Sequence, residues 1–368
     1  MQKSDIINAF LEKGKLLTPK AIEFLEGKNI ESFLVEDYKE SILDEPTLSL
    51  HDNIRIIKTL TEKKKEITTQ DFINFYKSKY EKMRNIITQR LQKDFTSLNK
   101  LDSARKEVHI IGIVKDMKKR DNKIIVELED MTTTIPVLFD EIGDLELDDV
   151  VAVMAIAAGK ILYGKKILWP DIPLRQPTKG FGKACFISDL HLDEAPEQDF
   201  MKFIEWFARQ DIKYLFVAGD VGDDKLFEKA IESYCTNKKI FMIPGNMDKA
   251  EKDEYPQLPR KYESKRITAL SNPAIIEING IKILMIHNIT LDMLKKRYLG
   301  KSKTILNEDY LALEEIPDIV HCGHTHEAQV QNYKSVTIVN SGSLLTEFRP
   351  VVVDFETRDV EQIDLEKV

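Results

Sequence analysis

The second half of this sequence places metal-binding residue types directly after short apolar runs. Five of these runs are expected to be strands, and each is followed within a few residues by a carboxylate, an amide or an imidazole. The expected strands are Ala184–Ile187, Tyr214–Val217, Ile240–Ile243, Ile281–Ile286 and Ile316–Val320. The side chains that follow them are Asp189, His191, Asp220, Asn246, His287, His324 and His326. Because strand ends at one edge of a sheet carry the chemistry of α/β folds, we expect these side chains to converge.

The seven side chains supply two carboxylates, one amide and four of the seven imidazoles in the chain. Such donors suit divalent ions, of which we expect Mn²⁺, with Fe²⁺, Zn²⁺ or Mg²⁺ as alternatives. Asp220 follows Gly219, which allows a tight turn, and a central carboxylate can bridge two ions. Each segment alone is common by chance, and a lone strand-end histidine such as His287 is more often a hydrogen-bonding residue. Their conjunction predicts a centre for two metal ions. His321 lies inside a strand-like run, and we interpret it as a buried histidine with satisfied hydrogen bonds.

Helices are expected to alternate with these strands and to complete a layered α/β sandwich. Asn279-Gly280 separates two apolar runs and is a strong two-residue hairpin signal. Tyr333–Ser335 is expected to form a second hairpin turn. The expected helices are Pro196–Arg209, Lys225–Cys235, Leu291–Arg297 and Asn307–Leu313.

The first half of the chain predicts a helical unit followed by a barrel. Ser4 is expected to cap the first helix, and Thr18-Pro19 to begin a second that ends at Gly27. Apolar spacing over Asp71–Lys93 predicts a long amphipathic helix. A third helix over Ile30–Tyr38 and a strand over Ile54–Leu60 are also expected. Five short strands follow, at Val108–Val114, Lys123–Leu128, Thr133–Phe139, Val150–Ile156 and Lys160–Ile167. Strands of this number and length predict an OB-type barrel.

We therefore expect a multidomain α/β protein. The predicted parts are a helical N-terminal domain (1–42), a linker with a short strand and the long helix (43–104), an OB-fold domain (105–178) and an α/β sandwich domain (179–368). The barrel strands contain few aromatic residues for stacking bases, so we favour a scaffold role for the barrel over binding of single-stranded nucleic acid. From Lys77 to Lys106 there are nine Lys/Arg against three Asp/Glu, which fits either a solvated face or a surface for phosphates or a partner.

The composition is that of a soluble globular protein. Of 368 residues, 42% are hydrophobic and 32% charged, and the net charge of −8 excludes a surface devoted as a whole to gripping nucleic acid. The three cysteines suggest no disulfide framework and fit a reducing compartment. No signal-peptide pattern is visible, and no apolar run approaches the ~20 residues that span a bilayer. We expect a cytoplasmic protein without a membrane partner.

From Phe181 to about Asp354 the motifs resemble those of the calcineurin-like metallophosphoesterases, which bind two metals through D-x-H, G-D, G-N-H, H and G-H-x-H. The resemblance implies two ligand sets. Asp189, His191, Asp220 and His326 would hold the first ion, and Asp220 as a bridge, Asn246, His287 and His324 would hold the second. It also implies catalytic roles for Asp220, Asn246 and His324 in phosphodiester cleavage.

One position departs from that family pattern. The residue after Gly245-Asn246 is Met247, where the family has a histidine that helps to protonate the leaving oxygen. Methionine can neither donate a proton nor carry charge, and general-acid assistance is typically worth ~10²–10⁴-fold in rate. Metals are therefore expected to bind while turnover is slow or absent. Asp248 could substitute, although an unperturbed carboxylate is a poor acid at pH 7.

The whole layout resembles the small subunit of archaeal family D DNA polymerases. The stretches that carry the resemblance are Asp71–Arg84, Gly159–Pro173, Pro244–Asp248 with Tyr255–Pro259, and Gly323–His326 with Val339–Ser343. The resemblance implies a proofreading 3′–5′ exonuclease and scaffold subunit of an archaeal heterodimeric polymerase. The implied partners are the large catalytic subunit and DNA at single-stranded 3′ ends or primer–templates. A sliding-clamp contact stays open, because no clear clamp motif is visible.

Two other functions are weighed against this one. A non-catalytic assembly subunit that keeps its metals for structure is favoured by Met247. A stand-alone phosphatase or small-molecule phosphodiesterase is disfavoured, because the barrel and the N-terminal helices would have no evident purpose.

Overall fold

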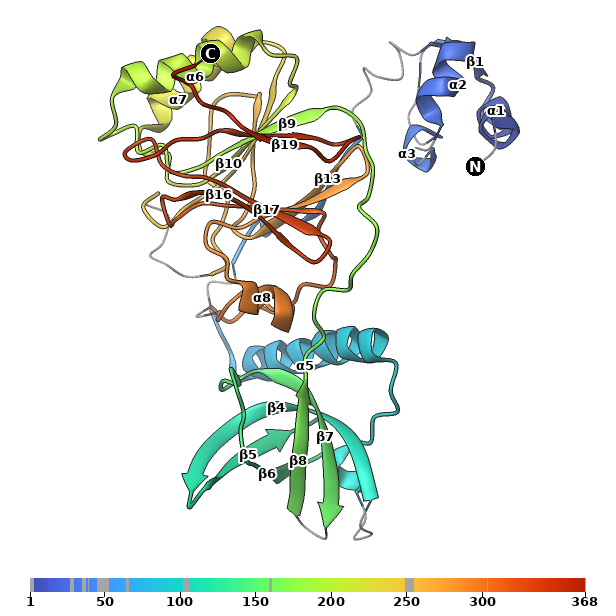
Figure 1. Cartoon of the computed structure of the whole chain (residues 1–368), viewed down its shortest axis with the longest axis vertical. Coiled ribbons are helices and arrows are strands. Elements are labelled where there is room, and N and C mark those ends of the chain that lie inside the picture. The colour runs from blue at the N-terminus through green and yellow to red at the C-terminus, as the bar shows by residue number, and fades with distance from the viewer. Residues whose placement is uncertain are drawn as a thin grey trace. The chain divides into compact units, whose positions relative to one another are not determined.

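The computed structural model describes residues 3–26, 30–34, 38, 40–44, 53–63, 66–101, 106–158, 161–248, 255–302 and 304–367. The chain forms two compact units (Figure 1). One comprises Met1–Glu62, Leu174–Ile289 and Ile316–Val368, and the other comprises Lys63–Pro173 and Thr290–Glu315. Within the described residues, no helix is both long and apolar enough to cross a membrane.

Two six-stranded sheets form the body of the first unit. The first sheet has the order β12 (Ile267–Ala269), β11 (Lys239–Ile243), β10 (Tyr214–Ala218), β9 (Lys183–Ile187), β18 (Val351–Asp354) and β19 (Val360–Gln362). The second has the order β16 (Ala328–Tyr333), β17 (Val336–Ser341), β15 (Ile319–Cys322), β14 (Ile281–Met285), β13 (Ala274–Ile278) and β3 (Ile54–Lys58). The two sheets share one apolar core, in which Phe186, Phe216 and Phe241 stack beside Ile276 and Ile283.

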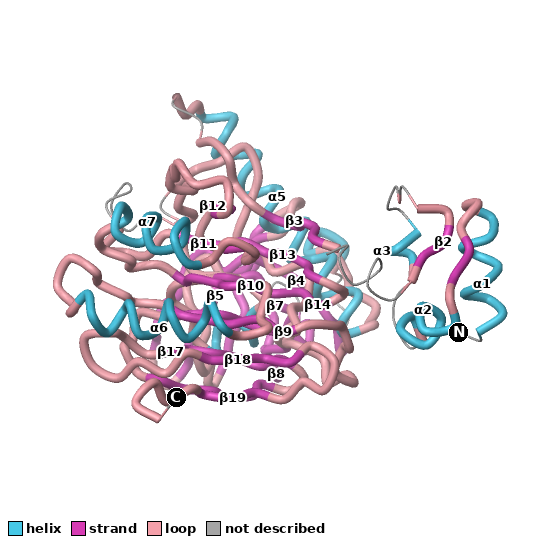
Figure 2. The backbone as a smooth tube through the Cα atoms, turned by 90° about the horizontal axis from the view of Figure 1, so that it is seen from above, coloured by secondary structure: helices cyan, strands magenta, loops and turns pink. Residues whose placement is uncertain are grey.

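Two helices cover the other face of the first sheet. α6 (Glu197–Arg209) and α7 (Asp224–Tyr234) bury Phe200, Phe203 and Phe227 against it. Figure 1 shows the layers in the order helices, first sheet, second sheet, and Figure 2 shows both helices along one side of the strands. The predicted α/β sandwich is confirmed, together with four of its five ligand-bearing strands and helices α6 and α7.

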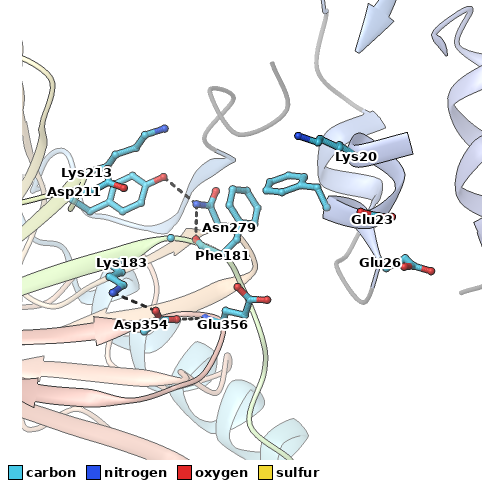
Figure 3. A pocket seen from close by; sticks show the side chains of 13 residues that line it. Lys20, Glu23, Glu26, Phe181, Lys183, Asp211, Lys213, Asn279, Asp354 and Glu356 are labelled. Carbon is cyan, nitrogen blue, oxygen red and sulfur yellow. Dashed lines mark hydrogen bonds and ion pairs between the residues drawn. The ribbon is translucent and has the colours of Figure 1, made fainter. Parts of the chain in front are cut away.

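The hairpin predicted at Asn279-Gly280 is confirmed, since Ile278 pairs with Ile281 across it. Both turn residues have positive φ, 52° for Asn279 and 87° for Gly280, as a two-residue hairpin turn of this type requires. The Asn279 amide nitrogen donates to the carbonyl of Phe181 and to the hydroxyl of Tyr214, each at 3.0 Å (Figure 3). The turn is therefore fixed to the neighbouring sheet by its own side chain.

Two details of the second sheet differ from expectation or refine it. The strand expected over Ile316–Val320 begins only at Ile319 and ends at Cys322, because Pro317 has no N–H to offer to a strand neighbour. Tyr333 pairs with Val336, which confirms the second hairpin.

The second unit contains a closed five-stranded barrel with the order β4 (Lys106–Arg120), β5 (Lys123–Glu129), β6 (Thr134–Phe139), β8 (Ile161–Leu168) and β7 (Val150–Ala158). The five predicted strands are confirmed, although Lys160 lies outside the described residues. β4 is far longer than expected, because a register shift between Val114 and Asp116 bends it and lets it continue to Arg120. The OB-type assignment and the domain limits stay predictions.

Helix α5 (Thr69–Leu91) confirms the long amphipathic helix. It starts with a capping box between Thr68 and Asp71. Tyr80, Met83 and Ile87 of α5 pack against the barrel. Part of its basic face is used inside the unit, because Lys79 lies 4.2 Å from the ring centre of Tyr298 and Lys82 donates to the carbonyl of Asp309 at 2.7 Å.

The segment Thr290–Glu315 belongs to the barrel unit. Its helix α8 (Leu291–Lys296) confirms the prediction there. The helix predicted over Asn307–Leu313 is wrong. Instead, the backbone of Leu311 and Leu313 pairs with that of Leu299 and Arg297, and the Asp309 carboxylate accepts from the Tyr298 hydroxyl at 2.6 Å. A buried carboxylate and an irregular strand pair therefore replace the helical turns that the apolar spacing predicted.

The N-terminal residues form α1 (Lys3–Glu12), β1 (Leu16–Leu17), α2 (Pro19–Leu25), α3 (Glu31–Leu34) and β2 (Ile42–Leu43). Thr18 caps α2 as predicted, since its hydroxyl accepts from the N–H of Ala21. Ser4 is not an N-cap, because α1 already includes Lys3. Of the third predicted helix the structure describes α3, and residues 35–37 lie outside the described residues. The predicted helix end at Gly27 and residues 45–52 of the predicted linker region also lie outside them.

Candidate metal centre

The carboxyl ends of neighbouring strands bring the predicted ligand turns together. β9, β10 and β11 are parallel neighbours in the first sheet, and β14 and β15 are parallel neighbours in the second. The turn after β9 hydrogen-bonds to the turn after β10, through Asp189 N to Gly219 O and His191 N to Asp220 O, both at 3.0 Å. The turn after β15 joins the turn after β14 through Gly323 N and His287 O at 2.9 Å.

Five of the seven predicted ligands adopt left-handed backbone conformations. Their φ angles are 53° at Asp189, 44° at His191, 53° at Asp220, 70° at His324 and 58° at His326. Non-glycine residues with positive φ are uncommon, and such strain gathers where a site over-determines the backbone. The clustering of this strain on five ligands is an argument for function that is independent of side-chain chemistry.

Two glycines allow the close approach of the turns after β10 and β11. A Cβ on Gly219, which has φ of 87°, would lie 2.4 Å from the backbone nitrogen of Gly245. A Cβ on Gly245 would lie 2.1 Å from Oδ1 of Asp220. Only glycine at both positions lets Asp220 and Asn246 lie side by side.

The first group of donors comes from the turns after β9 and β15. His191 Nε2 lies 3.1 Å from His326 Nε2, and His326 Nε2 lies 3.5 Å from Oδ1 of Asp189. The ligand atoms of these three residues all lie within 4.8 Å of one another.

The second group adds the turns after β10, β11 and β14. His287 Nε2 lies 3.2 Å from Oδ2 of Asp220 and 2.9 Å from Oδ1 of Asn246. His324 Nδ1 lies 2.9 Å from the same Asn246 oxygen. Asp189, Asp220 and His287 also fall within 4.8 Å of one another, so Asp189 contributes to both groups. The structure thus brings all seven predicted side chains together; the bridging role expected of Asp220 stays a prediction.

The donor set fits a pair of divalent ions. Two ligands ~2.1 Å from one ion and at right angles to each other lie ~3.0 Å apart. The five donor–donor distances given above are 2.9 to 3.5 Å. Asp189 and Asp220 are 0% and 2% exposed, and two buried carboxylates beside facing imidazole nitrogens need positive charge between them.

The two carboxylates have opposite electrostatic surroundings. Burial raises the pKa of Asp189. Burial acts in the same direction on Asp220, but the hydrogen bond and charge of His287 and the N–H of Met247 outweigh it and lower the pKa of Asp220. Burial favours the neutral ring of His287, yet its bond to Asp220 and the nearby carboxylates raise the pKa of His287 above its ordinary 6.5.

The other nitrogen of His287 is fixed by the backbone. Nδ1 lies 2.6 Å from the carbonyl oxygen of Ala218. In the neutral ring the proton sits on Nδ1 and is donated to that carbonyl, so the lone pair of Nε2 faces Asp220 and Asn246. A carbonyl that fixes the tautomer in this way is typical of histidines that bind metals.

The surroundings of Met247 and Asp248 settle what those two residues can do. The Met247 side chain is 63% exposed, while its N–H donates to Oδ1 of Asp220 at 2.7 Å. Asp248 is buried, and its carboxylate accepts from the N–H groups of Asp220, Val221 and Gly245 and from Arg260. The idea that Asp248 replaces the missing acid is wrong, because this carboxylate is an acceptor four times over.

His321 is buried as expected. Burial lowers the pKa of its ring to about 3, and the ring packs against Phe186. Within the described residues neither ring nitrogen makes a hydrogen bond of normal geometry, but the backbone of Ile187 acts on the ring and opposes the fall of its pKa, so the expectation of satisfied hydrogen bonds stays a prediction.

Several residues that support the ligands were missed from the sequence. The Ser343 hydroxyl donates to the carbonyl of Asp189 at 2.9 Å, and the Asn340 amide donates to the carbonyl of Gly323 at 3.0 Å. Asn272 accepts from the N–H of His287 at 3.2 Å. The stretch from Val339 to Ser343 carried a signal only through its resemblance to a family motif, whereas Asn272 and Arg260 carried none.

Comparison with known proteins agrees with this geometry. The model of the calcineurin-like phosphoesterase superfamily domain matches residues 183–358, which contain most strands of the two-sheet sandwich. A solved structure of a novel archaeal phosphodiesterase is 20% identical and covers 49% of this chain and 98% of its own. Its TM-score of 0.35 is too low to support an argument.

Most of the chain is similar to proteins named DNA polymerase II small subunit. That of Methanothermobacter thermautotrophicus is 28% identical over 76% of this chain and 74% of its own length. That of Archaeoglobus fulgidus is 27% identical over 81% and 76%, and that of Thermoplasma acidophilum is 24% identical over 93% and 86%. The predicted resemblance is confirmed: over most of its length the chain is similar to archaeal proteins named DNA polymerase II small subunit, and residues 183–358 match the calcineurin-like phosphoesterase model.

Proposed function

We propose that this protein is a two-metal phosphodiesterase that removes nucleotides from DNA 3′ ends as the small subunit of a heterodimeric replicative polymerase. The observation that carries the proposal is the convergence of all seven expected ligands in one centre, with Asp189, Asp220 and His287 buried and Asn246 and His324 facing solvent. The similarity to DNA polymerase II small subunits supports DNA as the substrate and a large catalytic subunit as the partner.

The ligands divide into two sets around the centre. Asp189, His191 and His326, with Asp220 as a shared ligand, would hold one ion. Asp220, Asn246, His287 and His324 would hold the other, with Mn²⁺ as the metal that we expect. When bound, such a pair lowers the pKa of water and neutralises charge on a phosphodiester.

The chain itself supplies the positioning and leaves one step unassisted. Ala218 orients His287, and the N–H of Met247 orients Asp220. Met247 provides no proton for the departing 3′ oxygen, and the Asp248 carboxylate is occupied by four donors. The leaving oxygen therefore takes its proton from solvent, and we expect slow turnover relative to a centre with an acid at position 247.

The barrel would serve as the scaffold. Its order β4-β5-β6-β8-β7 supports an OB-type assignment, and we propose the domain limits 1–42, 43–104, 105–178 and 179–368 on the same footing. Contact with a sliding clamp remains open in this proposal.

The test is a nuclease assay on 3′-mismatched primer–templates. The full chain, alone and with the large subunit, is supplied with Mn²⁺, and shortening of a 5′-labelled primer is followed. We expect shortening that stops with EDTA and with Asp220→Ala. Absence of shortening in both settings, or an Asp220→Ala variant as active as the natural chain, would overturn the proposal.

A second function is favoured by the exposed methionine at position 247. In that case the protein is an assembly subunit whose metals only hold the domain together. Metal bound at two ions per chain, no primer shortening, and weakened assembly with the large subunit after metal removal would support it.

A further inference from the structure

Residues 255–262 hydrogen-bond to Asp248 and to Gly245 in the turn after β11, and we call them the rear segment. The Arg260 guanidinium donates to Oδ1 of Asp248 at 2.8 Å and also contacts the carboxylate of Asp224, the first residue of α7. Arg260 thereby joins a buried carboxylate to a helix start. Neither contact touches the seven ligands directly.

Asp248 connects Arg260 to two ligand turns through hydrogen bonds. Its side chain is 1% exposed, and its oxygens accept from Asp220 N at 2.8 Å, Val221 N at 3.1 Å and Gly245 N at 2.9 Å. One carboxylate thus ties the turn that carries Asp220 to the turn that carries Asn246. A buried carboxylate keeps such a role only while its charge is balanced, and Arg260 is the cation that balances it.

Gln257 extends the same support to a third turn. Its amide nitrogen donates to Gly245 O at 3.2 Å, and its oxygen accepts from the Asn272 amide at 2.7 Å. Asn272 in turn accepts from the N–H of His287. The rear segment therefore reaches the turns of Asp220, Asn246 and His287.

The remaining ligand turns have a different support. Asp189 O accepts from the Ser343 hydroxyl and from Leu344 N, and Gly323 O accepts from Asn340. In the part of the chain that the structure describes, the side chains of Gln257 and Arg260 make no hydrogen bond to these turns. The turns of Asp220, Asn246 and His287 thus have side-chain supports that the turns of Asp189, His191 and His326 lack, although backbone hydrogen bonds join neighbouring turns and His324 shares its turn with His326.

We propose that Arg260 is a positioning residue for one ion only, the ion of Asp220, Asn246 and His287, and that the two ion sites are separable. The inference rests on the proposed two-metal centre. Loss of Arg260 displaces Asp220 and Asn246 together. The other ion then loses only the shared ligand Asp220 and keeps Asp189, His191 and His326 as its three protein ligands.

Metal content measures this directly. Arg260→Gln in the full chain, dialysed against Mn²⁺ and analysed by elemental mass spectrometry, is expected to hold one ion where the natural chain holds two. Electron paramagnetic resonance is expected to change from the signal of a coupled Mn²⁺ pair to that of an isolated ion. Arg266→Gln is the matched control, because Arg266 pairs with Glu232 on the surface and reaches no ligand turn.

A conservative variant separates positioning from general damage to the fold. Arg260→Lys keeps a cation for Asp248 but cannot also span to Asp224, so we expect two ions with the second bound about 10-fold to 100-fold more weakly. If Arg260→Gln fails to fold, the affinity of the second ion in Arg260→Lys decides.

Two outcomes overturn the inference. One is two ions bound with natural affinity in Arg260→Gln, or in Arg260→Lys if the former does not fold. The other is loss of both ions together. A natural chain that binds no metal would instead remove the proposed function itself, so the two failures are distinguishable.

Discussion

The turn between β4 and β5 of the barrel and the turns after β9 and β10 of the phosphoesterase domain contain aspartates in the same backbone conformation. Asp121 has φ of 47°, and Asp189 and Asp220 both have φ of 53°. Asp121 is exposed at a hairpin tip, whereas Asp189 and Asp220 are 0% and 2% exposed. A left-handed aspartate at a strand end is thus an ordinary turn when water solvates it. When it is buried among imidazoles, the strain and the desolvation point to a bound cation.

The largest effect that tests this comparison comes from placing glycine at each kind of turn. Glycine suits positive φ, so Asp121→Gly and Asp220→Gly both relieve backbone strain. We expect Asp220→Gly to lower primer shortening by about 10³-fold or more, because it removes a metal ligand. Asp121→Gly should leave activity unchanged and shift the free energy of unfolding by no more than about 1 kcal/mol. Similar nuclease rates for the two variants would break the comparison.

A second variant tests the exposed residue beside the buried carboxylates. Met247→His keeps the backbone N–H that holds Asp220 and adds a group able to protonate a leaving oxygen. We expect primer shortening to rise by about 10²-fold, at the lower end of general-acid assistance. Single-turnover rates with saturating Mn²⁺ measure it, and Met247→Leu is the control. A rate equal to that control would mean that protonation does not limit turnover.

A third variant tests the support of the turn that carries both His324 and His326. Asn340→Ala removes the amide that donates to Gly323 O at 3.0 Å and to the Thr325 hydroxyl at 3.1 Å. We expect Mn²⁺ affinity to fall about 10-fold, as for other residues that orient ligands. Isothermal titration provides the measurement. Asn332→Ala, on the exposed side of the same hairpin, should bind as the natural chain does, and equal losses in both variants would argue against a positioning role.

The smallest effect is a pH dependence that metal should reverse. Because the folded-state pKa of His287 is raised, the stability that it contributes is fully present below about pH 6.5 and is lost as pH rises through the folded value. Metal must displace that proton, so affinity grows with pH, by up to about tenfold per unit. Melting temperatures from about pH 6 to about pH 8 should fall in EDTA and rise in Mn²⁺. Parallel trends in both buffers would contradict this assignment.

The sequence was informative where a residue type has one local cause. Apolar runs followed by Asp-x-His, Gly-Asp, Gly-Asn, a single His or Gly-His-x-His placed the strands and the seven candidate ligands, and Asn279-Gly280 placed a hairpin. These signals lie within a few residues of the element that they predict.

It failed where a residue is used by a distant part of the chain. Asp248 was considered as an acid, because its four donors become visible only when the turns after β10 and β11 meet. Asn307–Leu313 has helical apolar spacing, yet Asp309 is buried against Tyr298 and the local propensity is overridden. Arg260 and Asn272 belong to no motif, and their partners lie in turns far along the sequence.

The segment Thr290–Glu315 limits how this chain can be divided for experiments. This segment lies in the sequence between β14 and β15, but it belongs to the barrel unit, where its Ala312 is buried with Tyr80, Met83 and Ile111. A fragment that begins near residue 179 would retain Thr290–Glu315 but would lack the residues of α5 and the barrel against which this segment packs. Such a fragment would expose the apolar side chains of this segment to water, and we expect it to aggregate or to bind chaperones. To study residues 179–368 in isolation, Thr290–Glu315 should be replaced by a short connector, or the barrel should be kept.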